Sequence, residues 1–319
     1  MLETPVALLI FNRPETTARV FAEIARAKPK RLLVVADGPR SDEEAEKCAA
    51  ARAIIERVDW DCDVLTNFSE VNLGCGIRPA TGIHWIFENC EEAIILEDDC
   101  LPHPTFFRYC MELLDYYRED ERVMAISGNN FQKGNIRGSQ SYFFSHYPYC
   151  WGWATWKRAW QYYDYKIALW QQVRDTSLLA DLLGNPVIGT YWAKALDTVF
   201  DGKKADVWDY QWMFTCWIQH GLAILPNVNL VSNIGFGSAA THTKEDLYGM
   251  ANLDVGAIEF PLAHPSYVIP DFEADRFAYD NFFAKETYHP GFPKIVLRRI
   301  FDFLPTSFQE KVLQLRARN

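Results

Sequence analysis

Three adjacent carboxylates are the residues best suited to do chemistry in this chain. The segment "EEAIILEDDCLP", from Glu91 to Pro102, runs four apolar residues directly into Glu97, Asp98 and Asp99. At the end of a buried strand, desolvation and mutual repulsion raise the free energy of such carboxylates, so we expect a cation beside them. Oxygen ligands suit Mg²⁺ and Mn²⁺, which one or two carboxylates usually hold and substrate phosphates complete. The alternative is a solvated acidic turn or the first turn of a helix.

The elements that would position these carboxylates alternate between strand and helix over the first 127 residues. Strand patterns occur at 6–11, 31–36, 62–67, 93–96 and 123–128, with helical patterns at 14–27, 42–57, 80–90 and 105–119. This alternation predicts an α/β fold with a mostly parallel central sheet and helices on both faces. In such sheets, ligands bind beyond the carboxyl ends of the strands.

Polar loops follow four of these strands at that end. They are Asn12-Arg13-Pro14, Asp37-Gly38-Pro39, Glu97-Asp98-Asp99 and Gly128-Asn129-Asn130. Because the carboxyl ends of parallel strands lie at one edge of a sheet, we expect these loops to converge on one site.

The character of the chain changes after about Ser139. Aromatic residues crowd the segments "SYFFSHYPYCWGWATWKRAW" and "VWDYQWMFTCWIQHG". We therefore expect 1–127 and 128–254 to be the donor-binding and acceptor-binding halves of one domain. Residues 255–319 would then form a C-terminal extension that includes amphipathic helices.

Several segments resemble GT-A-fold glycosyltransferases, the nucleotide-sugar enzymes whose acidic DxD motif ends a central strand. The N-acetylglucosaminyltransferase I type, in which this motif reads E-D-D, is particularly similar. The matching segments are "AIILEDDCLPHPTFFRYC", "AISGNN", "YPYCWGWATWKRAW" and "VWDYQW", which occur in the family's order between about Ile94 and Gly237. The resemblance implies a GT-A (Rossmann-like) fold with an aromatic-rich acceptor side.

The resemblance also implies roles for residues of the donor site. Asp99 would be the ligand of Mn²⁺ or Mg²⁺, and Glu97 and Asp98 would meet the donor's sugar and ribose. Asp37 would bond the uracil, although a loop aspartate is also a common turn former or helix cap. The further residues of the implied donor site are Phe11, Asn12 and Arg13 beside the base, and Asn72 and Gly74 in a donor-side loop.

Aromatic and late-chain residues complete the implied site. Trp151, Gly152 and Trp153 could form a stacking wall with a point of close approach for a sugar, although tryptophans at this density are usually core residues. His242, in "SAATHT", would belong to a loop that covers the diphosphate, and its alternative is an ordinary loop histidine.

Asp209, in "DVWDYQW", is the candidate catalytic base. An inverting transferase needs a base to take the proton of the acceptor hydroxyl as it attacks the anomeric carbon. The family has two consecutive acids after the tryptophan, whereas Tyr210 replaces the second here, so Asp206 is the fallback. Asp209 could also be the N-cap of the helix that the segment predicts.

Composition narrows the class of protein. The chain has 319 residues, a formal charge of −10, 11 Trp, 15 Tyr and 21 Phe. The negative charge argues against a nucleic-acid partner, because a basic surface supplies most of that affinity. The eight cysteines form no CxxC pair, which predicts buried free thiols and a reducing compartment.

The two ends of the chain bear on its location. The N-terminal segment "MLETPVALLIFNRPE" has an acidic residue at Glu3 and lacks the basic region and the small-residue cleavage site of a signal peptide, and no apolar run approaches the length of a membrane span. We expect a cytoplasmic protein, peripheral on the membrane if the basic C-terminal segment after Pro293 docks on anionic lipid. Ordinary surface helices are the alternative for that segment.

Together these features predict a metal-dependent, inverting glycosyltransferase. It would move a sugar, with N-acetylglucosamine as the first candidate, from a UDP-sugar to a hydroxyl of a glycan or lipid-linked glycan. The alternatives are a sugar-phosphate nucleotidyltransferase, which would need an early glycine-rich phosphate loop, and a non-catalytic carbohydrate-binding protein.

Overall fold

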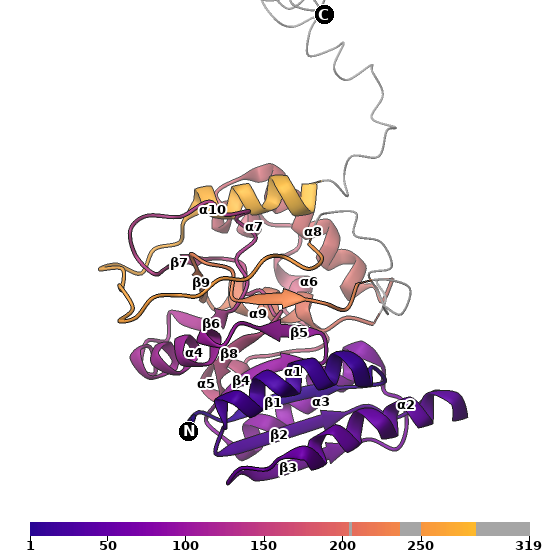
Figure 1. The fold of residues 1–319 in the computed structure, drawn as a ribbon. Coiled ribbons are helices and arrows are strands. Elements are labelled where there is room, and N and C mark those ends of the chain that lie inside the picture. The colour runs from indigo at the N-terminus through magenta and orange to yellow at the C-terminus, as the bar shows by residue number, and fades with distance from the viewer. Residues whose placement is uncertain (204–205, 237–249, 285–319) are drawn as a thin grey trace, which may run out of the picture.

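A computed structural model describes residues 1–203, 206–236 and 250–284, and its centre is one eight-stranded sheet (Figure 1). The order of the strands across the sheet is β3-β2-β1-β4-β8-β6-β9-β7. Their bounds are β1 Val6–Ile10, β2 Arg31–Ala36, β3 Asp63–Phe68, β4 Glu92–Glu97, β6 Val123–Ser127, β7 Tyr142–Ser145, β8 Trp153–Trp156 and β9 Leu222–Pro226.

The predicted α/β architecture is confirmed. Strands β3, β2, β1 and β4 pair in parallel, and β6 pairs in parallel with β9. Strand β8 runs antiparallel between β4 and β6, and β7 runs antiparallel beside β9. The sheet is therefore mostly parallel, and its first four strands have the 3-2-1-4 order of doubly wound folds.

The helices connect and cover these strands. Their bounds are α1 Pro14–Ala27, α2 Asp42–Ala53, α3 Gly74–Asn89, α4 Thr105–Tyr116, α5 Lys157–Trp160, α6 Trp170–Val173, α7 Leu178–Leu182, α8 Pro186–Phe200, α9 Asp209–Ile218 and α10 Phe272–Ala278. A 3₁₀ turn, Ile54–Arg57, continues α2, and a π-helical turn, Tyr279–Phe283, follows α10. Helix α3 begins six residues earlier than the sequence pattern predicts, since it accommodates Pro79 within its second turn.

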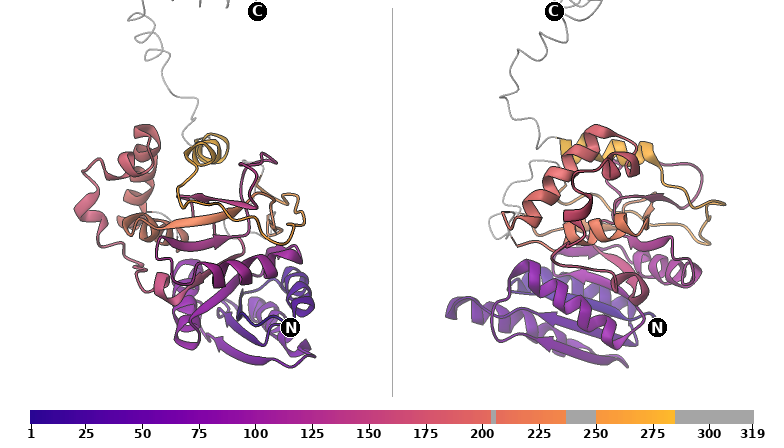
Figure 2. Two further views of the ribbon diagram at one scale, coloured as in Figure 1. Left: turned by 90° about the vertical axis from the view of Figure 1, so that its left-hand side faces the viewer. Right: turned by 180° about the vertical axis from the view of Figure 1, so that it is seen from behind.

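Alternate residues of the strands feed two cores on opposite faces of the sheet. On one face, Val6 and Leu8 of β1 pack with residues of α1, α2 and α4. On the other face, Ala7 and Leu9 pack with α3 and with the aromatic residues of the second half. Figures 1 and 2 show α1 and α3 on these opposite sides. Helices thus cover both faces, as predicted.

The aromatic second half belongs to the same sheet as the first half. Strands β6, β8, β9 and β7 extend the sheet beyond β4. Beside them, Trp153 stacks on Trp208 at 5.8 Å and lies 5.6 Å from Trp212, between ring centroids. Trp160 contacts the same cluster at 5.1 Å from Trp212. Most of these tryptophans therefore build the core between the sheet and α9.

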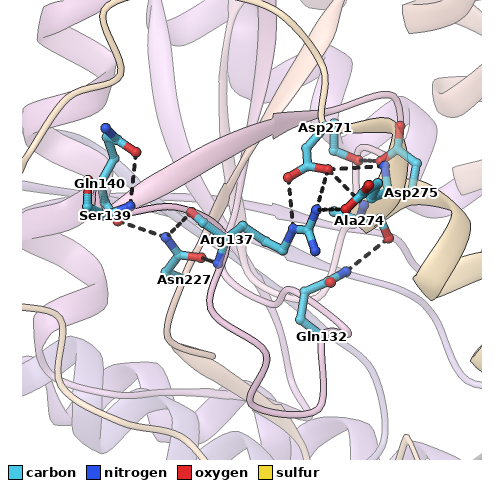
Figure 3. A network of polar contacts seen from close by, with 10 residues as sticks. Gln132, Arg137, Ser139, Gln140, Asn227, Asp271, Ala274 and Asp275 are labelled. Carbon is cyan, nitrogen blue, oxygen red and sulfur yellow. Dashed lines mark hydrogen bonds and ion pairs between the residues drawn. The ribbon is translucent and has the colours of Figure 1, made fainter.

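Two later segments close the fold. Strand β10, Val231–Asn233, pairs antiparallel with β5, Cys100–Pro102, directly after the acidic triplet. Helix α10 is fastened by a polar network that Figure 3 shows, in which Arg137 binds the carboxylate of Asp271 at 2.8 Å and Gln132 donates to the carbonyl of Ala274.

The remaining predictions concern disulfides, membrane-spanning helices and the basic C-terminal segment. The eight cysteines form no disulfide, as predicted, and five of them are buried. Within residues 1–203, 206–236 and 250–284, every helix is too short or too polar to cross a membrane. The basic C-terminal segment after Pro293 lies outside the described residues.

Candidate active site

The polar loop after β1 contacts the acidic triplet that ends β4. Strand β1 lies between β2 and β4. The chain passes from β1 to β2 and β3 on one side and then crosses to β4 on the other side, and doubly wound folds bind ligands at such a switch point. The backbone N–H of Phe11 donates to Asp98 Oδ2 at 3.0 Å, and Arg13 Nη1 lies 2.7 Å from Asp99 Oδ2. The predicted convergence is therefore observed for these two loops.

The triplet is held in an electrostatically unfavourable state. Desolvation first, and then the charges of Asp99, Asp98 and Asp209, raise the pKa of Glu97 well above its usual range. Desolvation and then Asp99 raise the pKa of Asp98 to about 7. The guanidinium of Arg13 opposes both shifts, at 2.7 Å from Asp99 and 4.0 Å from Asp98. In the described part of the chain, three carboxylates lie beside the guanidinium of Arg13, so the site still favours a cation.

Asp99 has a partner on each carboxylate oxygen, because Oδ2 lies 2.7 Å from Arg13 Nη1 and Oδ1 accepts the thiol of Cys100 at 3.6 Å. In the described part of the chain, no group of three or more His, Cys, Asp or Glu side chains is arranged to hold a metal. Ile234 donates its N–H to the carbonyl of Asp99 at 2.8 Å, and a Cβ on Gly235 would overlap the Asp99 carboxylate. Only glycine leaves room there. A single carboxylate completed by phosphate and water oxygens matches Mg²⁺ or Mn²⁺.

Asp37, after β2, has the opposite surroundings. It is 6 % exposed, and its Oδ1 accepts the N–H groups of Gly38 and Leu73, each at 2.9 Å. Its Oδ2 accepts Asn72 Nδ2 and the N–H of Gly74, each at 3.0 Å. Asp37 therefore clamps the loop that starts α3, and Asn72 and Gly74 are part of that clamp.

Arg40 and Glu44, which the sequence analysis did not single out, organise the loop after β1. Asn12 Nδ2 donates to Glu44 Oε1 at 2.6 Å, and Arg40 binds the same carboxylate. Hydrogen bonding from Arg40 lowers the pKa of Glu44 to about 2. The guanidinium of Arg40 also lies 5.4 Å from the ring centroid of Phe11. The i, i+4 spacing of Arg40 and Glu44 at a helix start is the signal that could have found them.

Asp209 lies at the start of α9 and faces the triplet. The chain reaches helical geometry at Asp209, and Trp208 is the N-cap residue, so the expected capping position is one residue earlier. Its Oδ1 accepts the N–H of Tyr210 at 3.1 Å. The charge of Asp209 contributes to the raised pKa of Glu97, after burial and the charges of Asp99 and Asp98, so the two carboxylates lie within electrostatic range of each other.

The predicted aromatic wall is only partly available. Trp153 is 1 % exposed and lies inside the tryptophan cluster, so the expectation that it stacks on a sugar is wrong for this residue. Trp151 is half-buried, with Phe131 at 5.3 Å and Phe236 at 5.8 Å between ring centroids. Gly152 has a φ of +64°, and a Cβ there would meet Val231 at 2.7 Å, which explains the glycine by packing. His242 lies outside the described residues.

The loop after β6 carries two asparagine side chains, of which one makes a hydrogen bond that holds the loop and the other is buried without one among the described residues. Asn130 Nδ2 donates to the carbonyl of Pro226 at 2.8 Å, which ties the loop to β9. Asn129 is fully buried, and among the described residues neither its Oδ1 nor its Nδ2 has a hydrogen-bond partner. An unpaired buried amide is costly, so a water or ligand oxygen would be stabilised beside it.

Two grooves of the surface lie elsewhere. One, of about 770 Å³, runs between α2 and the edge strand β3, and the other, of about 500 Å³, lies beside α7 and the end of α9. None of their lining residues belongs to the predicted site, so neither groove marks the chemistry.

No protein-family model and no curated protein matches the sequence. Among solved structures, mouse xyloside xylosyltransferase 1 in its apo form is 14% identical with a TM-score of 0.33, covering 67% of this chain and 81% of that chain. UDP-glucose pyrophosphorylase complexed with UDP-glucose is 14% identical with a TM-score of 0.26, covering 50% and 71% respectively. The 4-diphosphocytidyl-2C-methyl-D-erythritol synthase of Anaerococcus prevotii DSM 20548 is 11% identical with a TM-score of 0.32, covering 58% and 86%. These scores describe partial likeness only.

Proposed function

We propose that the protein is a metal-dependent, inverting glycosyltransferase of the GT-A type. The observation that carries the proposal is the buried acidic triplet at the carboxyl end of β4, with Asp209 within electrostatic range of Glu97. These four carboxylates repel one another, and a cation bound among them together with an anionic diphosphate would stabilise the arrangement. The resemblance of the E-D-D and Trp-Asp segments supports the same activity.

The proposed donor is a UDP-sugar. Phe11 and Arg13 would line the base and the phosphates, because both already contact the triplet. Asn72 and Gly74 lie in the loop held by Asp37, so this loop would form the other wall of the nucleotide site. A direct hydrogen bond between Asp37 and the uracil stays a prediction. It would require one of the four groups that now donate to Asp37 to give up its hydrogen bond.

Asp99 would hold Mn²⁺ or Mg²⁺, which when bound neutralises the charge that develops on the leaving diphosphate. Asp209 would take the proton of the acceptor hydroxyl. The hydroxyl oxygen then forms a bond to the anomeric carbon, the bond from that carbon to the diphosphate oxygen breaks, and UDP leaves. Attack from the face opposite the leaving group inverts the anomeric centre.

The sugar and the acceptor follow from resemblance and surroundings. N-acetylglucosamine is the first candidate for the sugar, and the half-buried Trp151 offers an aromatic edge near the site. The acceptor would be a glycan or a lipid-linked glycan. A cytoplasmic enzyme that reaches such a lipid would be peripheral on the membrane.

A panel of UDP-sugars tested by thermal shift with Mn²⁺ and with EDTA examines this function. A ligand at a hundred times its dissociation constant stabilises the folded state by about 2.7 kcal/mol. We expect stabilisation by a UDP-sugar only with the metal, and slow release of UDP from that donor. No stabilisation by any UDP-sugar would argue against the proposal.

The nucleotidyltransferase alternative is disfavoured by the loop after β1. Only Phe11, Asn12 and Arg13 separate β1 from α1, and none is a glycine. Pro14 opens α1 without an N–H to offer a phosphate. Formation of a nucleotide-sugar from UTP and a sugar phosphate, with no glycosyl transfer, would restore this alternative.

A further inference from the structure

Asp206 occupies the N-terminus of α3, although the two are 130 residues apart in sequence. Its carboxylate sits so close to Gly74 and Gly76 that a Cβ on either glycine would overlap it. The N-cap residue of α3, Leu73, makes no side-chain capping bond. Asp37 already accepts the N–H of Gly74, and the partial positive charge of the first turn also stabilises the nearby Asp206 carboxylate.

Further contacts seat the same segment on α3. The thiol of Cys75 donates to the carbonyl of Asp206 at 3.4 Å, and the hydroxyl of Tyr165 donates to its carboxylate. A Cβ on Gly76 would lie 3.0 Å from the backbone N of Val207. Burial first, and then the charge of Asp206, raise the pKa of Cys75 to about 11. Backbone and side chain of Asp206 are thus both fitted to the first turn of α3.

The segment that begins at Asp206 ends at the candidate base. Trp208 is buried, its ring stacks on Trp153, and its carbonyl accepts the hydroxyl of Tyr163 at 3.1 Å. Asp209 follows at once as the first residue of α9. Residues 206–208 therefore form a short strap between the donor-side helix α3 and the tryptophan core, and Asp209 is its next residue.

We propose that Asp206 is a positioning residue that latches this strap onto α3 and so fixes the start of α9, where the Asp209 carboxylate lies. The inference rests on the proposed function for the meaning of that placement. It gives Asp206 a role distinct from that of a second base, because its carboxylate is directed at α3 and Tyr165. It also explains why both Gly74 and Gly76 lack a side chain.

A double-mutant cycle tests how Asp206 acts. We expect Asp206→Ala to lower kcat about tenfold while the KM for the UDP-sugar stays within about twofold. In an Asp209→Asn background, the same change should alter the residual rate by less than twofold, because a latch acts only through the base it positions. Equal loss in both backgrounds would overturn the proposal. So would a loss as large as that of Asp209→Asn alone.

Two further variants separate the latch from a general loss of stability. Gly76→Ala leaves the Asp206 side chain intact but pushes it off α3, so it should lower kcat as Asp206→Ala does. Asp201→Asn is the matched control, because Asp201 pairs with Lys203 and makes no contact with α3. It should leave kcat unchanged. Wild-type kcat in Gly76→Ala would contradict the latch.

Amide hydrogen exchange tests the latch without any activity, so it separates this inference from the proposed function. In Asp206→Ala we expect faster exchange both at 74–78 and at 209–212. Unchanged exchange at 209–212 would overturn the latch even in an active enzyme. A wild-type protein that transfers no sugar but shows both changes would retain the latch and lose the function.

Discussion

Asp37 and the Glu97–Asp99 triplet follow parallel strands at the same edge of the sheet, yet their surroundings are opposite. Asp37 accepts four hydrogen bonds, two on each oxygen. Asp98 accepts one N–H, and the triplet shares the guanidinium of Arg13. One carboxylate stabilises its loop, whereas burial and mutual repulsion raise the pKa values of Glu97 and Asp98.

The difference separates residues that hold the site from residues that would react in it. A carboxylate with all its acceptor positions filled contributes to folding and has little left to offer a ligand. Carboxylates that repel one another are retained against their cost in stability, which is typical of functional sites. Mutations in the two regions should therefore change stability in opposite directions.

The largest effect is expected at Asp209, where the acidic site would meet the acceptor. Asp209→Asn keeps the shape of the side chain but cannot take a proton. Turnover should fall by a hundred- to ten-thousand-fold, about 3 to 5 kcal/mol of barrier, while affinity for UDP-sugar stays within about threefold. Steady-state kinetics and UDP titration measure both. Near wild-type turnover in this variant would show that the base was misassigned.

On the satisfied side, Asp37→Asn should destabilise the fold. The amide replaces one accepting oxygen with a donor that faces the N–H groups of the clamped loop. We expect a loss of about 3 kcal/mol in the free energy of unfolding, measured with urea. A loss below about 0.5 kcal/mol would mean that the clamp is not structural.

Asp99 tests whether the acidic triplet binds a metal. UDP affinity of the wild type should rise about tenfold or more on replacing EDTA with Mn²⁺, about 1.4 kcal/mol of coupling. Asp99→Asn should lose most of this coupling and remain folded by circular dichroism. Equal UDP affinity with EDTA and with Mn²⁺ in the wild type would refute the metal.

An effect of opposite sign to that of Asp37→Asn is expected at Asp98. Its pKa is about 7 in the folded protein, against about 3.9 for an unfolded chain. Between these values the unfolded state binds fewer protons, so wild-type stability falls as pH rises from about 4 to 7.

Asp98→Asn removes this pH-dependent loss of stability. Its stability relative to the wild type should rise with pH and reach about 2 kcal/mol above the wild type at pH 8. Urea unfolding at pH 5 and pH 8 measures the change. A variant less stable than the wild type at pH 8 would remove the contrast with Asp37.

Much of the donor half could be predicted from local pattern. The helix from Pro14 to Ala27 and the strand that ends at Glu97 lie where the sequence places them, because apolar periodicity and flanking Pro, Gly and Asp residues act locally. From the sequence, the structural role expected of Asp37 was that of a turn former or helix cap, not that of a clamp on a distant loop. Its four donors include residues 35 to 37 positions away, which no local pattern indicates.

The aromatic half of the chain shows more clearly what the sequence cannot predict. The sequence shows that Trp151 and Trp153 flank a glycine, but the two residues have different surroundings in the fold. Trp153 belongs to β8 and points into the core, whereas Trp151 precedes the strand and is half-buried. Which face a residue presents depends on the strand's neighbours, and β8 pairs with β4 and β6 from elsewhere in the chain.

The sequence by itself determined the type of sheet, the end of it that carries the polar loops, and the excess of carboxylates that calls for a cation. Tertiary structure alone decided which carboxylates are satisfied. It brought Asp209 to Glu97, Arg13 to Asp99 and Asp206 to the start of α3. The physical reason is that hydrogen bonding and desolvation act over a few ångströms of space, and residues 86 to 132 positions apart become such neighbours only when the chain is folded.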